Sequence, residues 1–356
     1  MNTPYFEITQ TQKGWQAVFA YQAIHRPGDE WIKMRWGFNA LALLDEALDR
    51  YKLFIDSQTV NELEFRTGTV QNNALALRGI HSPELGLKMV LLGKSCAPGR
   101  EKAQQCAEQY AREVSSTFPY DFILVPAETE NDFQDFGGND LLTHDVKVAQ
   151  IQRGLLPLPA AHAPPYLMGL WQSGPRSNEQ IWRALSAMPQ PALFNILIQP
   201  SFLYPNEKHI LLDIKKRISD PGQNNESISA YIPWVEDYIK RRLEVWKRFF
   251  LVQVHLVIDG RMENLIRSIG SVLTQDSDKL SLPGYQVRYP VSPDEGKQWL
   301  ENIRSLDLTE SSPRPDDLAD TEEVFSIFRF PYRQEMGLPG ANFSEMEKGP
   351  ENHQGD

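Results

Sequence analysis

Two stretches of this chain follow one pattern, and that repeat constrains the fold more than any other feature. Residues 99–126 begin with Gly-Arg, continue with helical periodicity and end in a short apolar run between two prolines. Residues 260–290 do the same, and in both stretches the two prolines stand seven positions apart. A strand-like apolar run precedes each stretch, at 87–92 and at 249–258. The pattern predicts a β-α-β unit used twice in one α+β chain.

The segments around these units predict the domain organisation. We expect an N-terminal α+β domain over 1–152 and a second α+β domain over 153–306, each containing one ferredoxin-like unit with a mixed or antiparallel sheet. Four prolines between Pro157 and Pro165 favour a boundary near the start of the second domain. Residues 307–356 read as an acidic linker, a short amphipathic helix and a flexible tail.

The charge balance bears on the class of partner. The formal net charge of the 356 residues is −11, which opposes broad nucleic-acid binding because phosphate contacts need Lys and Arg. Two local groups of basic residues are exceptions to the negative charge. One is residues 215–217, and the other is the basic positions between Lys240 and Arg248, which lie on one predicted helix. The polar start at 1–13 and the lack of a long apolar run predict a cytoplasmic protein without membrane insertion.

No catalytic motif is complete in the sequence. Gly93-Lys94-Ser95 follows a strand, but position 88 holds lysine where a phosphate-binding loop needs glycine. The two cysteines, Cys96 and Cys106, lack the spacing of a zinc site. No Ser-His-Asp arrangement is recognisable. We therefore expect no cofactor, and a binding role is favoured over an enzymatic one.

The best enzyme candidate is the carboxylate-rich stretch 128–145. Glu128, Glu130 and Asp132 lie within five positions, and close carboxylates bind hard cations or share acid–base work. Their spacing does not follow a calcium-binding loop. A solvated acidic surface is the alternative interpretation of the same residues.

A family resemblance enters at the C-terminal end. Residues 321–331 start acidic, continue as an apolar helix and end in Arg-Phe-Pro, and Gly-Leu-Pro-Gly follows at 337–340. This segment resembles the connector that precedes the motor domain in VirB4/HerA-like translocation ATPases. The repeated units ahead of it are similar in style to the amino-terminal, non-motor region of those ATPases. The ATPase domain itself has no counterpart in this sequence.

The resemblance implies an interaction module rather than a motor. We expect an accessory subunit of a cytoplasmic translocation or DNA-processing ATPase assembly, with a protein partner such as a separately encoded hexameric ATPase. Phe325, Phe328 and Phe330 are the predicted partner-binding residues. Two alternatives stay open: an α+β scaffold or regulatory protein without a motor partner, and a metal-dependent enzyme that uses 128–145.

Overall fold

The computed structural model describes most of the chain. The described residues are 3–12, 14–25, 40–60, 72–142, 146–157, 166–174, 178–218, 232–244, 247–274, 284–309 and 314–331. The predicted flexible tail beyond 331 therefore lies outside the described residues.

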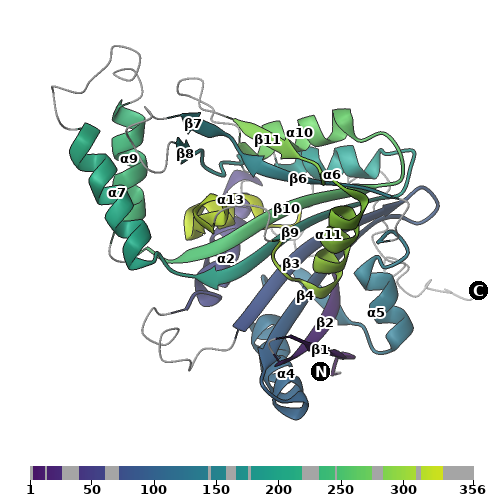
Figure 1. Cartoon of the computed structure of the whole chain (residues 1–356). Coiled ribbons are helices and arrows are strands. Elements are labelled where there is room, and N and C mark those ends of the chain that lie inside the picture. The colour runs from purple at the N-terminus through teal and green to yellow at the C-terminus, as the bar shows by residue number, and fades with distance from the viewer. Residues whose placement is uncertain are drawn as a thin grey trace, which may run out of the picture.

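One large antiparallel sheet runs through the molecule (Figure 1). Eight strands follow the order β1-β2-β4-β3-β9-β10-β6-β11, while β5 pairs with β2 and β12 pairs with β10. A separate two-stranded ribbon joins β7 (Leu155–Pro157) to β8 (Tyr166–Met168). The strands of the large sheet are β1 (Glu7–Thr11), β2 (Gly14–His25), β3 (Asn72–Ser82), β4 (Gly86–Ala97), β5 (Phe122–Pro126), β6 (Lys147–Arg153), β9 (Ala192–Ser201), β10 (Phe249–Ile258), β11 (Tyr285–Arg288) and β12 (Leu318–Asp320).

Within each half of the sheet, the strands pair with one another. In the N-terminal half β5 pairs with β2, β2 with β4, and β4 with β3. In the C-terminal half β11 pairs with β6, β6 with β10, and β10 with β9. The halves meet where β3 pairs with β9 in antiparallel register, so the sheet is continuous across the centre.

The main hydrophobic core lies on one face of this sheet. Side chains at alternate strand positions, such as Leu77 and Ile196, pack there against four helices. The apolar stripe of α4 shows why these helices form, since Ala103, Ala107, Tyr110 and Val114 recur at helical spacing and are all buried. The four helices are α2 (Ala40–Ser57), α4 (Arg100–Thr117), α6 (Asn178–Ser186) and α10 (Glu263–Thr274).

The opposite face is covered by α5 (Glu130–Gly137) and α11 (Pro293–Ser305) and contains buried polar groups. Arg78 on β3 is fully buried there and donates to Asn195 Oδ1 (3.0 Å), to Ile303 O (2.7 Å) and to Gly137 O. Burial lowers the pKa of Arg78 to about 9. Because the two carbonyls belong to the ends of α11 and α5, one guanidinium joins both helices to the centre of the sheet.

The remaining helices are α7 (Pro205–Ile218) and α9 (Ile232–Leu243), which project from one end of the molecule, and the short α12 (Arg314–Asp317) and α13 (Thr321–Ile327) (Figure 1). No helix of the described part is long and apolar enough to cross a membrane.

The structure confirms the α+β class and revises several local expectations. The Gly93-Lys94-Ser95 tripeptide lies inside β4, whose backbone groups pair with β2 and β3, so it forms no loop. The predicted boundary at 152/153 falls within β6, which pairs with the second half. The helix predicted to reach Arg248 ends at Leu243.

Candidate functional site

The C-terminal segment 314–331, here named the strap, contains residues 321–331 of the predicted connector and packs into the fold. Its first element, α12, contacts β10 and β6. Next, β12 pairs with the first three residues of β10, Phe249–Leu251. The later residues of β10, Val254–Ile258, pair with β6. Then α13 packs against α2 on the main core face. The strap therefore passes from the face that carries α11 to the face that carries α2.

The three predicted partner-binding phenylalanines lie in different environments. Phe328 is 0% exposed and Phe330 is 2% exposed, both within the main core. Phe330 has ring contacts with Phe122 (5.6 Å) and with Trp182 (5.8 Å) between centroids. Phe325 is only partly buried. Phe328 and Phe330 thus contact the chain's own core in this fold, and Phe325 alone among the three reaches the surface in part.

A buried ion cluster holds the strap in place. Glu323 is 0% exposed and its carboxylate accepts from Arg153 Nη1 (2.9 Å), from the Trp171 N–H (3.1 Å) and from the Asp320 N–H (3.0 Å). Arg242 Nη1 lies 2.5 Å from the same carboxylate. Each oxygen of this carboxylate therefore faces one backbone N–H and one guanidinium nitrogen, and such pairing offsets the cost of burying the charge.

Asp320 completes the cluster and caps the helix that follows. Its carboxylate accepts from the backbone N–H groups of Glu322 and Glu323, forming a capping box at the start of α13. Arg241 also donates to it (Nη2–Oδ1 2.6 Å). Burial would raise the pKa of Asp320, but the hydrogen bond from Arg241 and the charges of Arg241 and Arg242 outweigh this and hold it at about 2.

The cluster changes the interpretation of the basic residues between 240 and 248. Arg241, Arg242 and Lys247 all form ion pairs with carboxylates of the strap, at Asp320, Glu322 and Glu323. Burial acts against the charge of Arg242, yet Glu323 and its neighbours raise its pKa above the usual value. These cations fix the strap and form no phosphate-binding surface.

Backbone hydrogen bonds secure the end of the strap. Arg329 donates to the carbonyls of Gly174 (2.7 Å) and Ser173 (3.2 Å). The Phe330 N–H donates to Tyr51 Oη (3.1 Å), and His25 Nε2 donates to Pro331 O (2.9 Å). Because Tyr51 and His25 belong to the N-terminal half and Arg153 to the C-terminal half, the strap joins the two halves.

In the structure, the predicted acidic metal site includes the cap of a helix. Asp132 accepts from the Thr129 N–H (2.9 Å) in a capping box of α5, and these hydrogen bonds lower its pKa. Glu128 and Glu130 are exposed beside it. Within the described residues no group of three or more His, Cys, Asp or Glu side chains is placed to hold a metal ion, and His144 and Asp145 lie outside that part.

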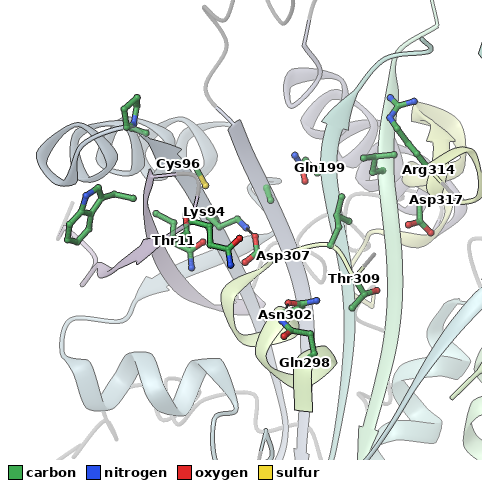
Figure 2. A pocket seen from close by; sticks show the side chains of 18 residues that line it. Thr11, Lys94, Cys96, Gln199, Gln298, Asn302, Asp307, Thr309, Arg314 and Asp317 are labelled. Atoms are coloured by element: carbon green, nitrogen blue, oxygen red, sulfur yellow. Dashed lines mark hydrogen bonds and ion pairs between the residues drawn. The ribbon is translucent and has the colours of Figure 1, made fainter. Parts of the chain in front are cut away.

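Sequence reasoning did not find a polar cleft of about 970 Å³ at one end of the central strands. Figure 2 shows Lys94 beside Asp307, and Gln298 and Asn302 together on α11. Its charged groups are matched within the chain: Lys94 Nζ lies 2.5 Å from Asp307 Oδ1, and Arg314 pairs with Glu207. Buried Asp317 accepts from Gln253 Nε2 (2.8 Å), and burial raises its pKa to about 7.

Comparison with known proteins yields no relative that decides the function. No protein-family model matches the chain, and no curated protein matches its sequence. The resemblance to VirB4/HerA-like ATPases therefore stays a prediction from the sequence.

Proposed function

We propose that this chain is a non-catalytic interaction module, an accessory subunit of a translocation or DNA-processing ATPase assembly. The observation that carries the proposal is the strap. Residues 321–331 resemble the connector that precedes the motor in VirB4/HerA-like ATPases. Buried ion pairs with Arg153 and Arg242 fix the strap to the C-terminal half of the sheet, and hydrogen bonds with Tyr51 and His25 fix it to the N-terminal half. A connector held this rigidly gives whatever binds near its end a defined orientation.

The architecture supports the proposal, because the two halves of the large sheet repeat one arrangement of strands and helices. The two halves together are here named the platform. Leaving aside β1, the β7–β8 ribbon and the helices α7 and α9, each half runs strand-helix-strand-strand-helix-strand along the chain. In the sheet, the first of these four strands lies between the fourth and the third. We interpret the halves as two ferredoxin-like units joined edge to edge through β3 and β9. The cytoplasmic location remains a prediction of the sequence.

The geometry gives less support to the alternative of a metal-dependent enzyme. Asp132 already accepts backbone hydrogen bonds as a helix cap, and Asp135 pairs with Lys88. A carboxylate used in this way offers a cation fewer free oxygens. The scaffold or regulatory alternative differs from our proposal only in the absence of a motor partner.

The test is cross-linked co-purification of the tagged full-length chain from its native cells, read by mass spectrometry. The proposal predicts near-stoichiometric recovery of an ATPase with Walker motifs. Phe325→Ser should reduce this recovery while the variant stays folded, and Val291→Ser, at an exposed apolar position just before α11, is the matched control. Recovery of no such ATPase would overturn the proposal in favour of the scaffold alternative.

A further inference from the structure

A helical arm projects from the platform where the first half has only a turn. In the N-terminal half, β3 and β4 are joined by the short turn between Ser82 and Gly86. In the C-terminal half, the equivalent neighbours β9 and β10 are joined through α7 and α9, here named the arm (Figure 1). Since the shorter connection suffices to close such a strand pair, the arm is not needed for the sheet.

The arm is a rigid element with its own small core. Leu211 and Ile214 of α7 pack against Val235 and Ile239 of α9. Ion pairs fix its base, because Glu207 at the start of α7 binds Arg314 and Arg241 of α9 binds Asp320. A surface carried by this arm is therefore presented at a fixed position relative to the sheet.

The exposed side of α7 is basic around an apolar centre. Leu212 is 47% exposed, which is unusual among the large apolar side chains of the described part. With 100° between successive helix positions, the exposed residues Lys208, His209, Lys215 and Lys216 fall in one sector around Leu212. A basic rim with an apolar centre is typical of a protein-docking surface rather than of a purely solvated helix.

Exposed carboxylates lie on α5 and α11, which Figure 1 shows on the other side of the molecule from the arm. Glu130 and Glu301 are exposed there, and Asp294 is 96% exposed. Burial is the main cause that raises the pKa of Glu7; the hydrogen bond from Gln134 and the charge of Arg304 lower it, and the charges of Glu130 and Glu301 raise it. Lys297 and Arg304 lie within 4.0 Å of Asp294 and Glu301, respectively, and Glu130 adds a further exposed carboxylate to this face.

We propose that the basic side of α7 in one copy of this chain docks on the acidic face of α5 and α11 in a second copy. The two surfaces lie at opposite ends of one molecule, so the arm of one copy cannot contact the acidic face of the same copy. The contact is therefore head-to-tail, which builds rings or open filaments rather than two-fold dimers. A nucleic acid is the weaker occupant, because the arm's arginines 241 and 242 are committed to the strap.

Sedimentation velocity on the full-length chain tests the proposal. We expect species heavier than the 40.7 kDa monomer at low salt, growing with protein concentration and dissociating between about 0.05 and 0.5 M NaCl as screening increases. The arm variant K208E/K215E/K216E should be monomeric. The control K52E/K102E/R112E changes the net charge equally at exposed positions elsewhere and should associate like the unmodified chain.

A charge exchange completes the test. The face variant E130K/D294K/E301K alone should be monomeric, and mixing it with the arm variant should restore association because acidic arms then meet basic faces. Thermal melting checks that each variant is folded. A monomeric unmodified chain at low salt, or an arm variant that associates like its control, would overturn the proposal.

Discussion

Removing the charge of Glu323 is the perturbation that most sharply probes how the strap is held. Glu323→Gln preserves the shape of the side chain but leaves the buried Arg153 and Arg242 without their common counter-charge. The new amide also turns an NH₂ donor toward donors that the carboxylate accepted from, including the Asp320 N–H.

The magnitude follows from the burial of all partners. Glu323 and Arg153 side chains are 0% exposed and Arg242 is 1% exposed, so water does not replace the lost interaction. Breaking a buried ion pair by removing one partner costs about 3–5 kcal/mol. Since domains of ordinary stability unfold with about 5–15 kcal/mol, the variant should lose a large part of its free energy of unfolding.

Equilibrium urea unfolding followed by tryptophan fluorescence measures the effect. The matched control is Glu322→Gln, whose carboxylate also pairs with Arg241 and Lys247 but is 56% exposed. That control should lose no more than about 1 kcal/mol. If the two variants lose the same free energy of unfolding within error, the buried cluster does not hold the strap as argued.

Four further variants probe the remaining contacts. Burial raises the pKa of Asp317 from 3.8 to about 7, so the folded state binds its proton more tightly, and the free energy of unfolding should fall as pH rises from 4 to 7; Asp317→Asn should flatten that part of a pH series of urea melts. Arg78→Met leaves the carbonyls that it binds without donors, at about 1–3 kcal/mol each, and should lower the unfolding midpoint by chemical denaturation. Phe330→Ala should cost about 3–5 kcal/mol in the same assay and Phe325→Ala less than half of that, because only Phe330 is enclosed by aromatic rings.

Local sequence patterns predicted the local elements well. The strand and helix of each repeated stretch appear as β4–α4 and β10–α10, because alternation and helical spacing are properties of a short window. The cap at Asp132 was also readable, since Thr129 stands three positions before an acidic residue that returns the hydrogen bond. The sequence alone could therefore have identified Asp132 as a helix cap rather than as a metal ligand.

Contacts between residues far apart in the chain could not be predicted from the sequence. The ion pair between Arg153 and Glu323 spans 170 positions, and no local pattern links them. Apolar spacing marked Phe328 and Phe330 as residues that need cover, but periodicity does not say whether the cover is a partner or the chain's own core. The pairing of β3 with β9, which makes one sheet of two halves, depends on edges that both halves left open.

Hydrogen–deuterium exchange of the unmodified full-length chain, read by mass spectrometry, tests the central claim most directly. If the strap is an integral part of the fold, amides of α13 should exchange as slowly as those of β9 and β10. Exchange of the strap within seconds, while the sheet remains protected, would contradict the claim. It would show instead that the strap detaches and releases Phe328 and Phe330 for a partner.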